Sequence, residues 1–309
     1  MFRRTLRVKK SAALLLVVAF VCLASRRADA NTPGHDLWLV STRGAGCGSE
    51  PALQYWHFAE GPGWLQASMA EFLAADQPGV PTVVWVHGNR IGFCESQNNG
   101  LRCFRSLSCR AADKPFRFVV WSWPADQVAG QLDDVRLKAN RSDCEAYHLA
   151  WLVNQIHPQV PVSLLGYSYG ARLSSGALHI LGGGHVNGRA LADLKPGRAP
   201  MRGVMMAGAL DNHWLAPGHR LGQAFNPVDR MLVFINPGDK VLSKYHLLYG
   251  WRKGPQALGS TGVCGGLGEH SAKLMQVNAS GVVGTTHDWS RYMESPQLIS
   301  RMRPYALFE

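Results

Sequence analysis

The chain has 309 residues, of which 46% are hydrophobic and 17% charged, the composition of a globular protein with a sizeable core. Its formal net charge is +11, but residues 1–30 hold seven Lys and Arg residues and one acid, a net of +6. The rest of the chain therefore carries only +5, which gives little reason to expect a nucleic-acid partner.

The first 30 residues are ordered like an export signal. A basic start, MFRRTLRVKK, precedes the apolar run AALLLVVAFVCLA, and the sequence ADA at positions 28–30 fits a small-x-small cleavage site. We therefore expect a cleaved signal peptide at residues 1–30, a mature chain that begins at Asn31, and a secreted or periplasmic protein. Arg26 and Arg27 keep an uncleaved membrane anchor as the alternative, in which this segment alone contacts the membrane.

Six cysteines follow the signal, at positions 47, 94, 103, 109, 144 and 264. An even number in an exported chain predicts up to three disulfides, with 15 alternative pairings. Three of the six crowd into residues 94–109, which we expect to be a loop held by disulfides. Neither C-x-x-C nor H-E-x-x-H spacing occurs, so we expect no metal site.

Short apolar, β-branched runs read as buried strands. They lie at residues 37–41, 82–88, 116–123, 162–168, 203–209 and 231–238, with a last strand within 274–281. Helical spacing of apolar residues begins at Leu65, Leu149 and Leu173, and the last of these helices ends at Gly182. Continuous apolar strands are typical of a parallel sheet covered on both faces. We expect one α/β domain, residues 31–309, with a mostly parallel sheet flanked by helices on both faces.

The motif Gly-x-Ser-x-Gly occurs once in a telling context, at residues 166–170. The apolar run VSLL leads into it and the helical pattern ARLSSGALHIL leads out. A strand before and a helix after are what a nucleophile elbow requires, since the serine hydroxyl must stand on a sharp turn above the sheet edge. Ser168 is therefore the candidate nucleophile.

A serine nucleophile needs a histidine base and an acid that orients it. Asp239 follows the strand at 231–238, and His287 follows the last expected strand. The order Ser, Asp, His along the chain is the one found in hydrolases whose serine stands on a nucleophile elbow. Asp211 is the rival acid, because it also follows a strand. His270 and His246 are the rival bases.

Charge that develops on a substrate carbonyl oxygen must be met by backbone N–H groups. The residue after the nucleophile, Tyr169, supplies one candidate donor. The loop after the strand at 82–88 supplies the second, for which we choose the Asn89 N–H, with Arg90 as its neighbour. His87 in this loop is interpreted as a structural residue.

Three further features bear on the site. Asp133 and Asp134 lie in a charged helical stretch and are expected on its solvated face. The long connection at 210–230 fits a lid or a plain surface excursion equally well. Trp251 and Trp289 are candidates for the wall of an acyl pocket.

The elbow, the His-Gly loop and the ordered Asp and His resemble the α/β-hydrolase superfamily over residues 37–290. The sequences STRG (41–44), HGNR (87–90) and WSWP (121–124) also resemble bacterial members of unassigned substrate. The chain departs from them in its cysteine-rich stretch and in Tyr167, where many relatives carry histidine.

The resemblance implies an exported serine hydrolase that cleaves a small-molecule or lipid carboxylic ester through an acyl-enzyme, without a cofactor. Two alternatives remain open at this point. One is a non-catalytic binding module on the same fold, because function resides in the site rather than the fold. The other is an acyltransferase that uses the same three residues.

Overall fold

A computed structural model gives the fold, and it describes residues 35–309 except 49–50, 110, 112–113, 129 and 250–253. The expected signal peptide at 1–30 and Trp251 lie outside the described residues. In this part of the chain, no helix is long and apolar enough to pass through a bilayer.

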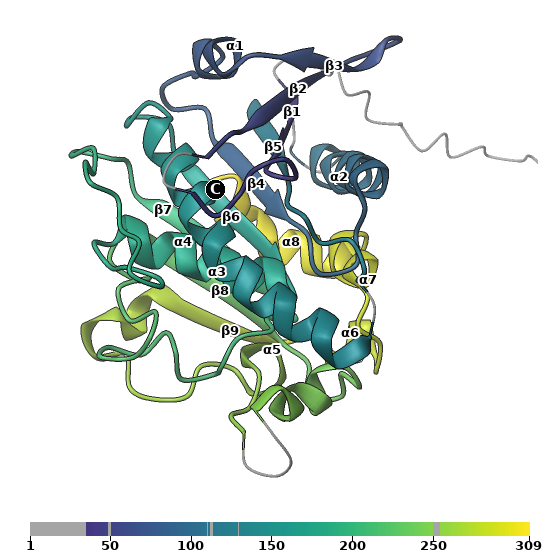
Figure 1. Ribbon diagram of the computed structural model, residues 1–309, viewed down its shortest axis with the longest axis vertical. Helices are drawn as coiled ribbons and strands as arrows, with labels where there is room; N and C mark the ends of the chain where they lie inside the picture. Colours follow the sequence, from purple (N-terminus) through teal and green to yellow (C-terminus); the bar gives the residue numbers. More distant parts are fainter. Residues whose placement is uncertain (1–34, 49–50, 110, 112–113, 129, 250–253) are drawn as a thin grey trace, which may run out of the picture.

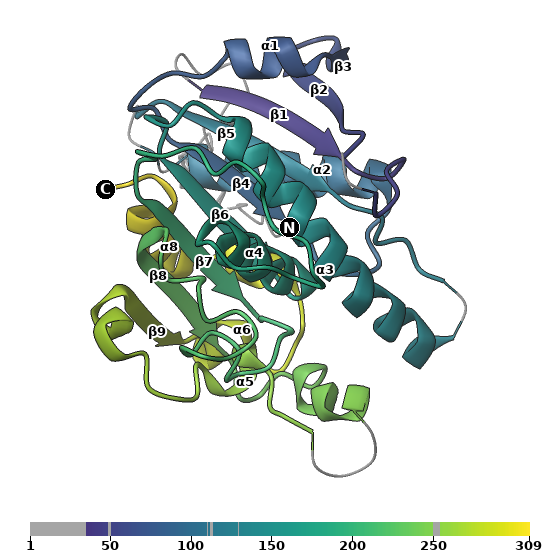
Figure 2. The same cartoon turned by 60° about the vertical axis from the view of Figure 1, so that its left-hand side comes forward.

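Nine strands form one twisted sheet in the order β3-β2-β1-β5-β4-β6-β7-β8-β9 (Figures 1 and 2). In chain order the strands are β1 (His35–Ser41), β2 (Gln54–Ala59), β3 (Gly63–Ala67), β4 (Thr82–Val86), β5 (Phe116–Ser122), β6 (Val162–Tyr167), β7 (Met201–Met206), β8 (Val228–Ile235) and β9 (Leu274–Asn278). From β1 to β9 in this spatial order, neighbouring strands are parallel, whereas β2 and β3 pair antiparallel at one edge. The sheet is therefore mixed but mostly parallel, as the sequence predicts.

Helices cover both faces of this sheet (Figure 1), with α3 and α4 on one face and α2, α7 and α8 on the other. The helices are α1 (Met69–Ala74), α2 (Phe93–Ser108), α3 (Gln131–Gln155), α4 (Tyr169–Leu181), α5 (Leu258–Thr261), α6 (Ser280–Val283), α7 (Trp289–Met293) and α8 (Pro296–Ala306), with the 3₁₀ helices η1 (Leu242–Tyr249) and η2 (Gly268–Lys273). Central strands β4, β5 and β6 are buried along their whole length, which explains their continuous apolar runs.

The seven expected strands are all present, and the helix expected from Leu65 is present but begins four residues later. Leu65 lies in β3 and is 48% exposed, and the helix α1 begins only at Met69. A tight turn pairs Ala59 with Gly63 and makes β2 and β3 a hairpin, so only the first residue of the helical pattern, Leu65, belongs to a strand. The capping box of Ser68 and Glu71 marks the true start of the helix.

The cysteine-rich stretch is also different from the expectation. Residues 93–108 form α2, a regular helix, and neither Cys94 nor Cys103 in it belongs to a disulfide. Cys103 faces the core as a small apolar side chain and is fully buried. The helix packs directly against β5.

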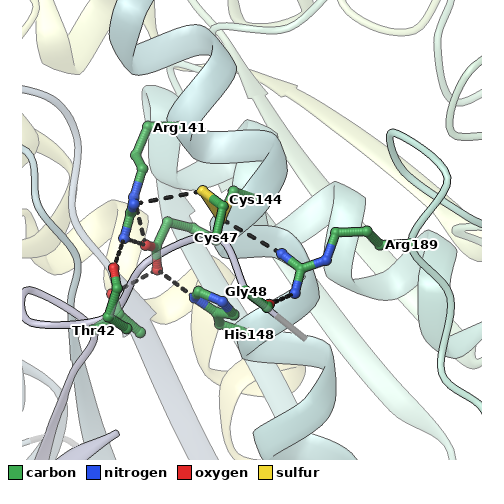
Figure 3. Close-up of a disulfide and its surroundings, with 9 residues drawn as sticks. Thr42, Cys47, Gly48, Arg141, Cys144, His148 and Arg189 are labelled. Carbon is green, nitrogen blue, oxygen red and sulfur yellow. Dashed lines mark hydrogen bonds and ion pairs between the residues drawn. A yellow bond between two sulfur atoms is a disulfide. The ribbon is translucent and has the colours of Figure 1, made fainter. Parts of the chain in front are cut away.

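One disulfide lies within the described residues, between Cys47 and Cys144, which are 97 positions apart (Figure 3). It joins the loop after β1 to the middle of α3. Beside it, the fully buried Glu145 accepts a hydrogen bond of 2.6 Å from the Thr42 hydroxyl and one of 2.9 Å from Arg141. The loop is thus held to the helix by polar contacts as well as by the disulfide.

Candidate active site

Ser168 stands on a sharp turn between β6 and α4. Its backbone has φ 56° and ψ −118°, a positive-φ conformation that is costly for a residue with a side chain. Three hydrogen bonds hold it there: its N–H donates to the Met206 carbonyl at 2.9 Å, and its carbonyl accepts from Ala171 at 3.0 Å and from Ala209 at 3.1 Å. The neighbouring strand β7 therefore fixes the turn that the sequence predicts.

The two glycines of the motif are required by close backbone contacts. A Cβ on Gly170 would lie 2.1 Å from the Val86 carbonyl oxygen, and one on Gly166 would lie 2.5 Å from the Cα of Ala171. No side chain fits at either position. The motif is needed for strand β4, strand β6 and helix α4 to meet at the serine.

Ser168, His287 and Asp239 lie in one hydrogen-bonded chain. His287 Nε2 is 2.9 Å from Ser168 Oγ, and His287 Nδ1 is 2.7 Å from Asp239 Oδ2. Asp239 is fully buried, and its other oxygen accepts the N–H groups of Val241 at 2.9 Å and Leu242 at 3.0 Å. The carboxylate is thus fixed from both sides, and it can hold the imidazole in one orientation.

The rival acid, Asp211, lies in a different network. Its Oδ1 accepts the hydroxyls of Tyr245 and Tyr249, each at 2.7 Å. It is buried, and it serves as an anchor for η1 rather than as a partner of His287. The structure therefore brings Asp239, and not Asp211, to the histidine.

The rival histidines have other surroundings. The His270 ring stacks on Phe225, with ring centroids 6.0 Å apart, and lies in η2 before β9. His246 lies in η1, half-buried. Of the three candidates only His287 has hydrogen bonds to both Ser168 and Asp239.

His87 has the structural role that the sequence indicates. It is buried, stacks on Trp123 at 5.8 Å, and its Nδ1 lies 2.9 Å from the Gly88 carbonyl oxygen. Burial lowers the pKa of His87 to about 3, so the ring is neutral near pH 7.

The two expected oxyanion donors lie beside the serine. Tyr169 is the first residue of α4, so its N–H has no partner in the helical ladder. The loop after β4 touches Ser168, since a Cβ on Gly88 would lie 3.0 Å from the Ser168 Cβ. In this loop the Asn89 Oδ1 accepts the N–H of Arg90 at 2.9 Å, which occupies that donor. No hydrogen bond within the described residues occupies the Asn89 N–H, which leaves it as the donor of choice.

The expectation that Asp133 and Asp134 both face solvent is half wrong. Asp133 is exposed, but Asp134 is fully buried and accepts a hydrogen bond of 2.8 Å from the Asn89 side chain. The spacing of charges along a helix could not reveal this, because the donors come from loops elsewhere in the chain.

A cavity of about 790 Å³ opens directly above Ser168 and His287. This is within the usual range for ligand pockets, roughly 300–1,000 Å³. Apolar and aromatic side chains form most of its lining: Ile91, Val135, Tyr167, Tyr169, Ala209, Val241, Leu242, Tyr245, Leu247, Leu248 and Trp289. Five charged residues lie among them: Arg90, Glu95, Lys240, Lys244 and Asp288.

Part of the wall of this cavity comes from an unexpected segment. Residues of the segment 240–248 line it, whereas none of residues 210–230 does. The latter connection packs along α3 and α4, where Arg220 binds Asp143 at 2.8 Å and the Gln223 N–H donates to His179 at 3.0 Å. The apolar run after Asp239, VLSKYHLLY, is the signal in the sequence that could have located the wall.

Trp289 lines the cavity, as expected from the sequence. Its neighbour Asp288 accepts the Ser290 N–H at 2.9 Å and caps α7. Across residues 35–309, outside the gaps given above, no three His, Cys, Asp or Glu side chains gather into a group that could hold a metal ion.

No family model matches this chain, and no curated protein matches it at a significant level. The case for a function therefore depends on the geometry of the site.

Proposed function

We propose that the protein is an exported serine hydrolase of the α/β-hydrolase fold that cleaves carboxylic esters through an acyl-enzyme on Ser168. The observation that carries the proposal is the hydrogen-bonded chain from Ser168 through His287 to Asp239, with the serine on a strained turn at the carboxyl end of a central strand. Strain of this kind at a buried polar cluster is typical of functional sites.

In the proposed reaction, His287 Nε2 takes the proton of the Ser168 hydroxyl while Oγ attacks the ester carbonyl carbon. The new C–O bond makes a tetrahedral intermediate whose negative charge resides on the former carbonyl oxygen. His287 then gives the proton to the leaving alkoxide, and the acyl-enzyme remains. Water repeats the sequence in the second half-reaction, and the carboxylic acid leaves.

Asp239 and the two N–H donors have separate tasks. The buried carboxylate accepts the Nδ1 proton, which holds Nε2 toward the serine and stabilises the imidazolium. The N–H groups of Tyr169 and Asn89 bind the oxyanion, and each such donor is worth roughly 10²–10³ in rate.

The substrate in this proposal is a small-molecule or lipid ester. The largely apolar lining above Ser168 suits an acyl chain or an apolar alcohol, while the charged residues stand among it. The disulfide between Cys47 and Cys144 supports an oxidising compartment, in agreement with the proposed signal peptide and a secreted or periplasmic location.

A fluorophosphonate probe tests the proposal directly. We expect it to label Ser168, and we expect Ser168→Ala to abolish labelling and to lower kcat for p-nitrophenyl esters by about 10⁶-fold, because the three residues act as a unit. Ser300→Ala is the control, since Ser300 is exposed on α8 and its hydroxyl donates to the Gln297 carbonyl, away from the site.

Absence of labelling in the folded wild-type protein would contradict the proposal and favour the binding module. An excess of alcohol in the same assay separates the acyltransferase, which would form a new ester faster than the free acid. A series of p-nitrophenyl esters of increasing chain length then defines the acyl group that the cavity accepts.

A further inference from the structure

The buried carboxylate of Asp134 connects the first turn of α3 to the loop that carries the proposed oxyanion donor. We infer that Asp134 is a positioning residue that holds the Asn89 backbone N–H toward the nucleophile, and so sets the oxyanion hole without touching the substrate. This inference rests on the proposed function.

Three donors from two different loops meet at this carboxylate. Oδ2 accepts the Asn89 Nδ2 group at 2.8 Å and the Arg90 Nε–H at 3.2 Å, while Oδ1 accepts the Val128 N–H at 3.0 Å. Asp134 has no exposed surface, whereas Asp133 beside it faces solvent. The carboxylate is therefore placed to hold a loop, which its exposed neighbour cannot do.

The loop it holds is under local strain. Arg90 has a φ of 60°, in the left-handed region that a non-glycine residue rarely adopts. Its backbone N–H donates a hydrogen bond of 2.9 Å to Asn89 Oδ1, and its guanidinium donates one to Asp134. Without the carboxylate, this backbone conformation loses the contacts that offset its cost, because both side chains bond to the same oxygen.

The carboxylate is suited to this task because it remains ionised. Burial raises its pKa, but the hydrogen bonds from Val128, Asn89 and Arg90 outweigh burial and hold the pKa of Asp134 below its ordinary value. The two oxygens of an ionised carboxylate only accept hydrogen bonds, and together they can accept all three N–H groups. An amide of the same shape would direct its NH₂ group at one of these donors.

The Asn89 N–H accelerates the reaction only if its hydrogen bond to the oxyanion of the transition state is stronger than its hydrogen bond to the carbonyl of the bound ester. A shift of about 1 Å in such a group costs up to 10²-fold in rate. Loss of Asp134 should therefore lower kcat and leave KM nearly unchanged.

The test uses the full chain with Asp134→Asn, which keeps the side-chain volume. We expect kcat for a p-nitrophenyl ester to fall roughly 10- to 100-fold with KM within about twofold. The inhibition constant of a trifluoromethyl ketone, whose serine adduct carries an oxyanion, should rise by the same factor. Asp133→Asn is the matched control, because it removes the same charge from the same helix turn. It should change neither value, because Asp133 is exposed and does not hold the loop.

Asn89→Ala keeps the backbone N–H but removes its tether, so it should reproduce the loss seen with Asp134→Asn. The double variant should be no worse than either single one, because both remove the same constraint. Asn89→Ala also keeps the inference testable if Asp134→Asn does not fold.

Additive losses in the double variant, or an unchanged trifluoromethyl ketone affinity, would overturn the inference while the wild type still hydrolyses esters. A wild type that neither hydrolyses esters nor binds the ketone would instead overturn the proposed function, and the inference with it.

Discussion

Two loops of this molecule carry a buried aspartate just after a strand, and the two aspartates have different partners. Asp239 follows β8 and bonds to the imidazole of His287 and to two backbone N–H groups. Asp211 follows β7 and bonds to the hydroxyls of Tyr245 and Tyr249. A position after the carboxyl end of a strand thus brings both carboxylates to the same edge of the sheet. The groups that hydrogen-bond to each carboxylate decide its role.

The difference also separates two tasks in the site. Asp239 belongs to the hydrogen-bonded chain that reaches Ser168, whereas Asp211 anchors η1, whose Tyr245 lines the cavity. We therefore expect changes at Asp239 to affect the chemical step and changes at Asp211 to affect which substrate fits.

Of the changes that compare the two aspartates, Asp239→Asn should have the largest effect. An amide in place of the carboxylate presents NH₂ to His287, which favours the wrong tautomer of the imidazole, and kcat should fall by about 10⁴-fold. Steady-state hydrolysis of a short p-nitrophenyl ester measures it. Retention of activity within about tenfold, with the protein folded, would contradict the assignment of the acid.

A smaller effect is expected from Asp211→Ala. The two tyrosine hydroxyls lose their acceptor, η1 loosens, and KM for a long-chain ester should rise by about tenfold, or about 1.4 kcal/mol. The kcat for a short-chain ester should stay within a fewfold. Loss of all hydrolysis with intact folding would instead make Asp211 part of the catalytic chain.

Burial of Tyr245 should also make the free energy of unfolding fall in alkali. Burial is the main cause that raises the pKa of Tyr245 far above its ordinary value of about 10. Above pH 10 the unfolded tyrosine loses its proton while the folded one keeps it, so the unfolded state binds fewer protons and the free energy of unfolding falls as pH rises. Below pH 10 this contribution is complete.

Urea unfolding at pH 9 to 11.5 measures this dependence. Tyr245→Phe should flatten the decline by up to about 1.4 kcal/mol per pH unit. An unchanged slope in this variant would mean that Tyr245 ionises equally in the folded protein.

The smallest effect distinguishes the two tyrosines. Tyr245 is 5% exposed and Tyr249 is 51% exposed, although both hydroxyls bond to the same oxygen. At pH 7, Tyr245→Phe should lower the free energy of unfolding by about 1–1.5 kcal/mol and Tyr249→Phe by less than about 0.5 kcal/mol, because water replaces the exposed bond. Equal losses would show that burial does not determine how much each hydrogen bond contributes to the free energy of unfolding.

The proximity of the three candidate side chains could be predicted from the sequence, because each of them follows a strand. A buried strand fixes where its last residue lies, so the order of strands along the chain is enough to bring Ser168, Asp239 and His287 to one edge of the sheet. The same reasoning missed the hairpin of β2 and β3, whose strands are half-exposed and lack a continuous apolar run.

Features that depend on contacts between distant segments could not be predicted. Asp134 reads as a surface charge in its own helix, and its role emerges only when Asn89 and Val128 close over it. Likewise, the spacing of the cysteines predicts a loop held by disulfides where α2 lies. The disulfide within the described residues instead joins Cys47 and Cys144.

That disulfide has a consequence for a chain cut by a protease. The turn between β2 and β3 is exposed at Glu60, so cleavage there would separate β1 and β2 from the fragment that bears Ser168, Asp239 and His287. Both pieces would nevertheless migrate as one band without a reductant, because the bond between Cys47 and Cys144 spans the cut. Under oxidising conditions a nicked molecule would thus keep its two fragments covalently joined, and the sheet would stay assembled after the backbone is cut.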